Sequence, residues 1–229
     1  LCDQSLCVSN AQRDKLALEG APIERMTVIH NGVDFEIFKP SPPERHDPNR
    51  LVFLGALVAD KGLHLLIEAF INLKPRYPKL ELDVFGSSSL WSRAEYLNIE
   101  ELKGALPELR FHGNVSQREA ANALATAGIC VVPSIWFDPF PLTSLEAQAC
   151  GTPVVAFNVG GLAEGIAHNS TGCIVDEVSQ EALTIALDAL LSDPKRLHFM
   201  SENCTSWTAQ RFSWESVISK ITALCEIPT

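Results

Sequence analysis

The residues with the clearest chemical signal lie in one short segment of the chain. A helix is predicted to begin at Pro141, since proline fits the start of a helix. The free backbone N–H groups of Leu142 and Thr143, together with the positive end of the helix dipole, favour a bound phosphate. Glu146 lies one turn further into this helix, and the preceding loop carries Asp138. The segment therefore combines a phosphate-binding helix start with two carboxylates.

A cation occupies a second candidate position. The loop Gly55–Lys61 follows a predicted strand, and Lys61 stands at the start of a helix predicted over 61–74. A cation in the first turn of a helix opposes the helix dipole, so we expect an anionic group to compensate it. A solvated lysine is the alternative.

Metal ligands are not indicated. The sequence has no Asp-x-Asp triplet and no His/Cys cluster at ligand spacing, so we expect no bound divalent metal. No nucleophile is paired visibly with a base, and we interpret as structural the scattered histidines His30, His64, His112 and His168.

A regular alternation of strands and helices must position these residues. Seven short runs are continuously apolar, which is typical of strands covered on both faces. The strand candidates are Arg25–His30, Leu51–Leu54, Leu80–Phe85, Leu109–His112, Ile129–Pro133, Pro153–Phe157 and Gly172–Val175. Helical spacing of apolar residues follows between them, as in Leu63–Ile71 and Leu183–Leu191.

Alternating strands and helices imply right-handed crossovers and a parallel sheet. We therefore predict an α/β fold with a Rossmann-like, doubly wound parallel sheet. Ligands of such sheets bind outside the carboxyl ends of the strands. The loops at those ends are Gly55–Lys61, Gly86–Leu90, Gly113–Gln117, Ser134–Leu142 and Asn158–Leu162.

Composition narrows the functional class. The 229 residues are 46% hydrophobic and 20% charged, which suffices for a sizeable core. A net charge of −10 argues against a nucleic-acid partner. No apolar run approaches the roughly 20 residues of a membrane-spanning helix. Seven cysteines without a Cys-x-x-Cys pair fit a reducing compartment, so we expect a cytoplasmic protein.

A proline-rich polar stretch suggests a division of the chain. Lys39–Pro48 contains four prolines and no apolar period, which favours a linker. We predict a small piece at 1–40, a linker at 41–49 and a main domain at 50–229 that ends in a C-terminal helix. The chain starts with neither Met nor a signal peptide, so we expect that it begins inside a longer protein.

The segment from Pro133 to Val155 resembles the E-x7-E element of retaining, nucleotide-sugar-dependent glycosyltransferases with the GT-B fold, the group 1 or family 4 class. Three further stretches resemble that family in the same order, namely His30–Asp34, Gly55–Gly62 and Gly160–Glu164. The resemblance covers nearly the whole chain. It implies the C-terminal, donor-binding half of a GT-B fold, with 1–40 as the tail end of the acceptor-side domain and the rest of the N-terminal domain missing.

The resemblance also implies roles for the candidate residues. Glu146 would accept hydrogen bonds from the ribose hydroxyls, because a carboxylate suits a vicinal diol. Asp138 would hold hydroxyls of the donor sugar. Lys61, with the helix start at Leu142 and Thr143, would stabilise the leaving diphosphate. A solvated helix glutamate and a loop aspartate are the alternatives for the two carboxylates.

The remaining donor-binding residues that the resemblance implies are Phe140, Pro141, Gly86, Ser87, Asn114 and Val115. Around Asn114 and Val115 the family grips the base through backbone groups, and a close backbone approach is expected at Gly86. For Asn114 the alternative is an ordinary turn residue.

The chain departs from the family pattern at three positions. Ala56 stands where the family has the Arg of an R-x4-K pair, which removes one of two cations expected at the diphosphate. Asp138 replaces a Glu and is one methylene shorter. Pro141 replaces a Gly and has no backbone N–H.

The implied activity is hexosyl transfer from a nucleoside diphosphate sugar, with UDP-glucose as the favoured donor, to a hydroxyl acceptor, with retention and without metal or other cofactor. Polysaccharide biosynthesis is the implied process. The acceptor would be a sugar or a lipid-linked sugar, so the full-length protein could associate with a membrane. The chain alone is expected to be inactive without its N-terminal half. The alternatives are a nucleotide-sugar binding module without turnover, or another GT-B enzyme such as an epimerase or phosphorylase.

Overall fold

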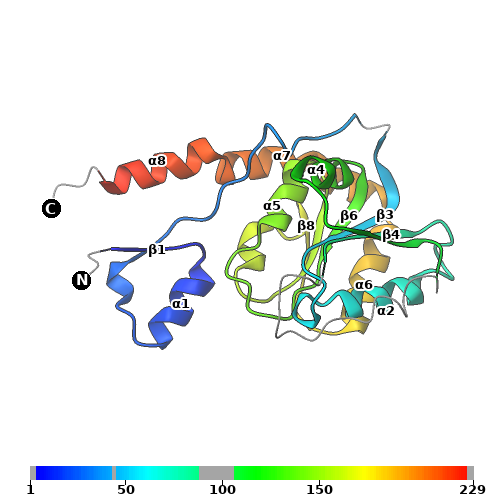
Figure 1. Ribbon diagram of the computed structural model, residues 1–229, viewed down its shortest axis with the longest axis horizontal. Helices are drawn as coiled ribbons and strands as arrows, with labels where there is room; N and C mark the ends of the chain where they lie inside the picture. Colours follow the sequence, from blue (N-terminus) through cyan, green and yellow to red (C-terminus); the bar gives the residue numbers. More distant parts are fainter. Residues whose placement is uncertain (1–3, 43–44, 88–105, 226–229) are drawn as a thin grey trace.

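The computed structural model describes residues 4–42, 45–87 and 106–225 of the 229. Figure 1 shows a main domain built around one sheet, from which a small N-terminal unit and a C-terminal helix project at the same side.

Within the described residues the main sheet has six strands, and all of them are parallel. The strands are β3 (Asp47–Leu54), β4 (Glu81–Phe85), β5 (Leu109–Gly113), β6 (Ala127–Val132), β7 (Val154–Phe157) and β8 (Gly172–Val175). Their spatial order is β5-β4-β3-β6-β7-β8, so the chain runs to one edge of the sheet and then returns to build the other half. This is the doubly wound order of a Rossmann-like fold, and it confirms the predicted class.

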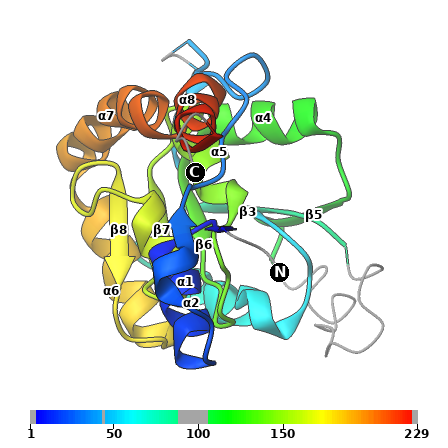
Figure 2. The same ribbon diagram turned by 90° about the vertical axis from the view of Figure 1, so that its left-hand side faces the viewer.

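Helices cover both faces of the sheet (Figure 2). Apolar residues of α2 (Leu63–Leu73) and α6 (Gln180–Leu191) form one core with the strands, and those of α4 (Gln117–Ala125) and α5 (Leu142–Ala149) form the other. Phe70, Phe157 and Leu145 are among the fully buried side chains. Burial on both faces explains why the strands read as continuous apolar runs.

A small unit precedes the main domain. It consists of β1 (Ser5–Cys7), α1 (Asn10–Leu18), the 3-10 turn η1 (Ile23–Arg25) and β2 (Met26–Val28), with β1 and β2 paired in parallel. The predicted division of the chain at 41–49 stays a prediction, and β3 already begins at Asp47.

The C-terminal helices run beside the connection between the two units. The long helix α7 (Pro194–Phe212) is followed by α8 (Trp214–Cys225). Val33 in the connection donates its N–H to the Phe212 carbonyl at 2.8 Å. The Trp214 ring lies so close to Gly32 that a Cβ there would come within 2.8 Å of it. The C-terminal helices therefore pack on the connecting segment.

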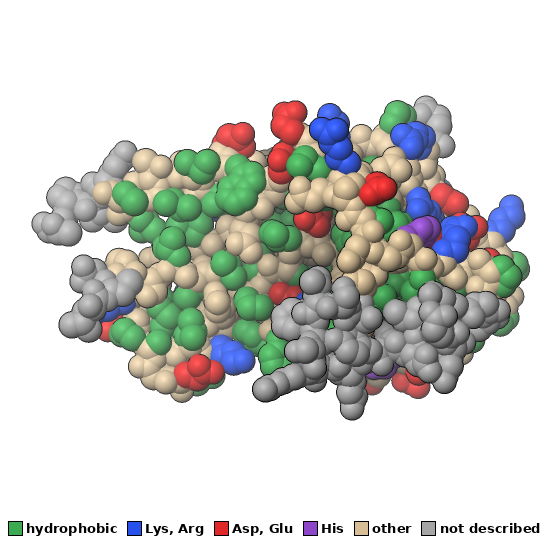
Figure 3. Space-filling view, viewed as in Figure 1, with side chains coloured by type: hydrophobic (Ala, Val, Ile, Leu, Met, Phe, Trp, Pro, Cys, Tyr) green, Lys and Arg blue, Asp and Glu red, His purple; other side chains and the backbone are tan. Residues whose placement is uncertain are grey.

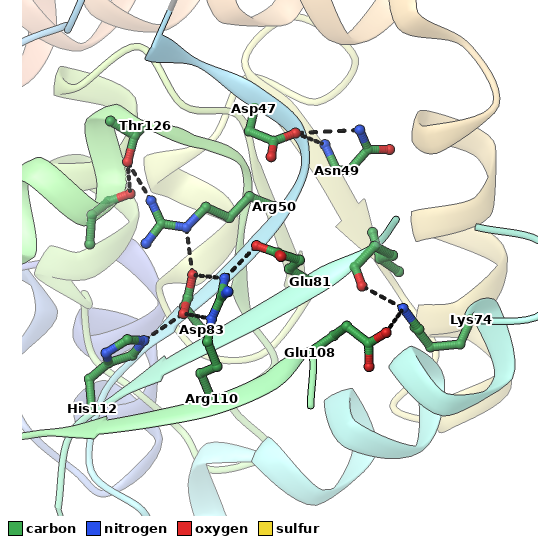
Figure 4. A network of polar contacts seen from close by, with 12 residues as sticks. Asp47, Asn49, Arg50, Lys74, Glu81, Asp83, Glu108, Arg110, His112 and Thr126 are labelled. Atoms are coloured by element: carbon green, nitrogen blue, oxygen red, sulfur yellow. Dashed lines mark hydrogen bonds and ion pairs between the residues drawn. The ribbon is translucent and has the colours of Figure 1, made fainter. Parts of the chain in front are cut away.

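A cluster of charged side chains on the sheet surrounds the buried Asp83 (Figure 4). Asp83 of β4 accepts hydrogen bonds from Arg50 at 2.5 Å, Arg110 at 2.9 Å and His112 at 2.5 Å. Burial alone would raise the pKa of Asp83, but these partners outweigh it and lower the pKa to about 2. The cluster joins strands β3, β4 and β5 by ion pairs in addition to their backbone ladder.

Candidate functional site

The candidate site lies where the strand order reverses. Strands β3 and β6 are neighbours at this switch point, and their crossovers leave in opposite directions. A crevice for ligands is expected there, between the loops that follow the two strands. The loop after β3 carries Lys61, and the loop after β6 carries Asp138. The structure brings them together, with the Lys61 Nζ 2.7 Å from the Asp138 Oδ2.

Close backbone packing holds the loop after β3 against the loop after β6. Gly62 has a left-handed φ of +67°, and a Cβ there would lie 1.8 Å from the carbonyl oxygen of Pro133. The Asp60 carbonyl accepts hydrogen bonds from the N–H groups of Ile135 at 2.9 Å and Trp136 at 3.2 Å. Only glycine fits at position 62, so the sequence fixes how closely the loops approach.

Lys61 lies outside the helix in which it was predicted. It ends the 3-10 turn η3 (Ala59–Lys61), and the left-handed Gly62 separates it from α2, which starts at Leu63. The reason for expecting an anion beside Lys61, its place in the first turn of a helix, therefore does not hold. Its ion-pair partner is Asp138, whose side chain is 14% exposed, against 33% for Lys61. Part of each side chain therefore faces solvent, where a ligand could reach it.

Helix α5 starts beside this ion pair. Its N-cap is Pro141, which provides no side-chain hydrogen bond. The Thr143 hydroxyl donates to the Leu54 carbonyl at 3.3 Å, which holds the start of α5 against the end of β3. Leu142 is exposed. The first N–H groups of a helix have no intrahelical acceptor, so α5 presents donors at the switch point. Gly151 follows α5 with a φ of +81°, as predicted for a C-terminal cap.

Glu146 lies in the second turn of α5 and is partly buried. Among the described residues, no hydrogen-bond or ion-pair partner of its carboxylate is found. Burial raises the pKa of Glu146 to about 7, and its charge also contributes to the raised pKa of Cys150. An unpartnered carboxyl group with a perturbed pKa, one turn beyond the start of α5, is a candidate for a ligand contact.

The loop of Asp138 is fixed from its other side by two glycines. The Gly161 N–H donates to the Asp138 carbonyl at 2.8 Å. A Cβ at Gly160 would lie 2.3 Å from the same oxygen, and a Cβ at Gly161 would lie 1.9 Å from the Pro139 carbonyl. This contact gives the Gly160–Glu164 stretch a structural role in placing Asp138.

Phe140 and Pro141 lie next to the ion pair, but the Phe140 ring points inward. It is 5% exposed and packs on His30 and Phe212, with ring centroids 4.8 and 5.6 Å apart. Any contact of Phe140 with a ligand would therefore use its backbone, and its predicted donor contact stays a prediction.

The loops after β4 and β5 contain the remaining predicted residues. Gly86 has a φ of +138°, and a Cβ there would lie 1.8 Å from the Gly55 carbonyl, so its close backbone approach is to the neighbouring loop. Its N–H donates to the Gly113 carbonyl at 2.8 Å, and the Ser87 carbonyl accepts from Leu57 at 3.2 Å. Residues 88–90 of this predicted loop lie outside the described residues.

Asn114 is exposed, and Val115 packs partly against the core before the Ser116 capping box of α4. Ala56 is partly buried in the loop after β3. The structure therefore joins Lys61 to Asp138 by an ion pair and holds the start of α5 against the end of β3 through Thr143, while it places Asn114 and Val115 on a separate loop.

A residue that the sequence reasoning left without a role is Glu164, in the 3-10 turn η4 (Leu162–Gly165) after β7. Its carboxylate lies 3.0 Å from the His30 Nε2 and also contacts α1. His30 was interpreted as structural. The signal for this pair was the presence of both residues in stretches that resemble the family, His30–Asp34 and Gly160–Glu164.

Other features lie away from the switch point. One cavity of about 580 Å³ is lined by the segment around residues 36–48 and by α4. A second cavity of about 600 Å³ is lined by the same segment and by α7. Across the described parts of the chain, no three His, Cys, Asp or Glu side chains are grouped as a metal site requires. None of the described helices is long and apolar enough to cross a membrane.

Comparison with known families decides the assignment of the chain. Residues 34–207 match the family described as glycosyl transferases group 1. The chain belongs to the group 1 glycosyltransferases. The predicted family and fold are thereby confirmed.

Curated relatives of this group 1 glycosyltransferase chain are about twice as long as the part that it matches. A D-inositol 3-phosphate glycosyltransferase 2 of Catenulispora acidiphila is 34% identical over 87% of the chain and 50% of the relative. A glycogen synthase of Mycobacterium tuberculosis is 29% identical over 94% of the chain and 52% of the relative. The chain therefore spans about half the length of the curated relatives it matches.

Solved structures share the fold of the group 1 chain. Anabaena Alr3699/HepE in complex with UDP-glucose has a TM-score of 0.84 at 22% identity, over 97% of this chain and 63% of that one. The C-terminal domain of a group 1 family protein, LpcC from Francisella tularensis, has a TM-score of 0.69 at 23% identity, over 80% of this chain and all of that one. The chain thus has the fold of the C-terminal half of a GT-B enzyme.

Proposed function

We propose that this chain is the donor-binding half of a retaining glycosyltransferase that uses a nucleoside diphosphate sugar. The observation that carries the proposal is the ion pair between Lys61 and Asp138 at the switch point, beside the uncapped start of α5. A cation and helix N–H groups suit a diphosphate. A carboxylate in the same crevice suits sugar hydroxyls.

In the proposed complex, Glu146 accepts hydrogen bonds from the ribose hydroxyls. Lys61 and the N–H groups of Leu142 and Thr143 stabilise the diphosphate, and Asp138 orients the donor sugar. Backbone groups near Gly86, Ser87, Asn114 and Val115 bind the base. UDP is the first nucleotide to consider, since neighbouring structures hold UDP or UDP-glucose.

The proposed reaction breaks the bond between the anomeric carbon and the β-phosphate oxygen. The hydroxyl oxygen of the acceptor forms the new bond on the same face of the sugar, and its proton passes to the departing phosphate oxygen. Lys61 and the start of α5 contribute by stabilising the charge that develops on the diphosphate. We propose that no metal ion takes part in this step. The acceptor hydroxyl belongs to a sugar or a lipid-linked sugar and binds the half that the longer relatives contain in addition.

Ala56 favours a second candidate function. Where the family pattern has a second cation for the leaving group, this chain has a methyl side chain. Loss of one such electrostatic contact costs roughly 10²- to 10³-fold in rate in comparable sites. Recognition of a nucleotide sugar without turnover is therefore the alternative. Transfer by the full-length protein would distinguish an enzyme from a binding module.

Calorimetry with UDP and UMP tests the proposed role of Lys61. Lys61→Ala should weaken UDP at least about tenfold, because a hydrogen bond to a charged group is lost, and should weaken UMP much less. Lys79→Ala is the matched control, since Lys79 is exposed and lies before β4, away from the crevice. Equal weakening of UDP and UMP would overturn the diphosphate role.

A further inference from the structure

Glu164 of the main domain makes several polar contacts with the N-terminal unit, and the proposed reaction gives these contacts no role. Its Oε2 accepts hydrogen bonds from the N–H of Asn10 at 2.8 Å and from the Asn10 side-chain amide at 2.7 Å. Its Oε1 accepts from the N–H of Ala11 at 2.8 Å. His30 Nε2 lies 3.0 Å from Oε2. Three donors of this set belong to the start of α1.

These contacts hold an ionised carboxylate at the positive end of a helix. Burial of Glu164 would raise its pKa, but the hydrogen bonds from Ala11, Asn10 and His30 outweigh burial and lower the pKa. The same helix start is also capped by Ser9, whose Oγ accepts from the Gln12 N–H at 3.0 Å. The start of α1 is therefore occupied by internal partners.

Two further contacts connect this unit with the loop of Asp138. Ser9 is fully buried, and a Cβ at Gly161 would lie 2.8 Å from the Ser9 Cβ. Gly161 in turn packs on the backbone of Pro139. Further along α1, the Lys15 Nζ lies 4.4 Å from the centre of the Phe137 ring. Helix α1 thus contacts Phe137 directly, and Gly161 lies between its N-cap residue Ser9 and Pro139.

His30 extends the same set of contacts to the start of α5. Its ring lies on Phe140, and the neighbouring Asn31 donates from its side-chain amide to the Phe140 carbonyl at 3.4 Å. Glu164 therefore contacts both α1 and a residue that packs on the donor loop. Its side chain is 20% exposed, so the contact is largely shielded from solvent.

We propose that Glu164 is a positioning residue, which clamps α1 onto the loop of Asp138 and so fixes the N-terminal unit relative to the donor sugar. The proposal rests on the proposed function, because it concerns the geometry of the same site. In the longer protein this clamp would set where the acceptor side stands over the sugar that Asp138 orients.

Hydrogen exchange and calorimetry together test this clamp. Glu164→Gln keeps the size of the side chain and removes its charge, Glu164→Asp keeps the charge, and Glu181→Gln changes an exposed glutamate of α6 as a control. We expect the α1 amides of Glu164→Gln to exchange at least about tenfold faster than those of the unmodified chain. Glu164→Asp should exchange more slowly than Glu164→Gln, and Glu181→Gln should exchange like the unmodified chain.

The affinity measurements separate this proposal from the proposed function. Glu164→Gln should bind UDP like the unmodified chain and lose several-fold of the preference for UDP-glucose over UDP. Unchanged exchange of α1, or equally faster exchange throughout β6 and β7, would overturn the positioning role. If Glu164→Gln does not fold, Asn10→Ala takes its place, since it removes one donor of the clamp. Failure of the unmodified chain to bind UDP would instead contradict the proposed function.

Discussion

Glu146 determines how nucleotide binding should depend on pH. Its pKa is raised to about 7 by burial, so below that pH most of the folded protein carries a neutral carboxyl group. Accepting two ribose hydroxyls favours the carboxylate. We predict that UDP affinity rises from about pH 5.5 to about pH 8, by up to about tenfold per pH unit below the pKa.

Calorimetry across this pH range measures the effect. Glu146→Gln is the control, because its side chain is neutral at every pH and should bind UDP weakly and without the slope. A slope that persists in Glu146→Gln would show that another group titrates. The same raised pKa lowers the stability of the fold as the pH rises from the ordinary glutamate value to about 7, since the folded chain then binds more protons than the unfolded one.

Ala56 offers a gain-of-function test. Restoring the second cation in Ala56→Arg should raise UDP affinity about threefold to tenfold and UMP affinity less, because the new charge would face the diphosphate. Ala56→Gln, which adds bulk without charge, is the control for packing effects in the loop. Equal affinities of Ala56→Arg and Ala56→Gln for UDP would show that position 56 does not face the diphosphate.

Gly62 determines the distance between the two loops of the site. Gly62→Ala would place a Cβ 1.8 Å from the Pro133 carbonyl at a positive φ, so we predict a loss of about 3 kcal/mol or more in the free energy of unfolding. Gly20 also has a positive φ of +95°, but a Cβ there would have no atom within 4 Å. Gly20→Ala should therefore lower the free energy of unfolding by only about 1 kcal/mol. Urea unfolding measures both, and equal losses would contradict the role of close packing.

Asp83 joins three strands and should control acid stability. Its pKa is lowered to about 2, so the stability that it provides is present above the ordinary aspartate pKa and is lost as the pH falls toward 2. We predict that Asp83→Asn removes part of the acid dependence of unfolding and destabilises the chain by about 3 kcal/mol, since Arg50 and Arg110 lose a buried partner. A variant as stable as the original chain at neutral pH would contradict this role.

The sequence predicted the strands better than the contacts between distant loops. All seven predicted strands form within a few residues of their limits. Six of them belong to the main sheet, where burial by helices on both faces leaves continuous apolar runs. The position of Lys61 in a 3-10 turn was missed, since it depends on the left-handed Gly62. The contacts of Glu164 with Asn10 join residues 154 positions apart, which no local pattern encodes.

At the scale of the whole molecule, apolar side chains remain exposed on the projecting parts. Figure 3 shows hydrophobic side chains gathered over α8 and over the N-terminal unit. Trp214 and Ile218 of α8 are 49% and 56% exposed, and Leu18 of α1 is 91% exposed. Apolar surfaces of this kind mark interaction sites or cause association. The longer relatives contain about as much chain again.

We predict that the chain self-associates with rising concentration through this surface. Ile218→Glu should reduce the association measured by sedimentation, because it places a charge on the exposed face of α8. Ile185→Glu is the matched control, since Ile185 is 70% exposed on α6, in the main domain. A chain that stays monomeric, or an equal effect of both variants, would contradict the assignment of the association to this surface.

The most direct test of the account is calorimetry of the chain with UDP, GDP and ADP in the presence of a metal chelator. We predict that one diphosphate, most simply UDP, binds in one-to-one ratio, and that Lys61→Ala and Glu146→Ala each weaken it. Binding by none of the three to the folded chain would contradict the claim that the switch point of this sheet is a nucleotide-sugar site.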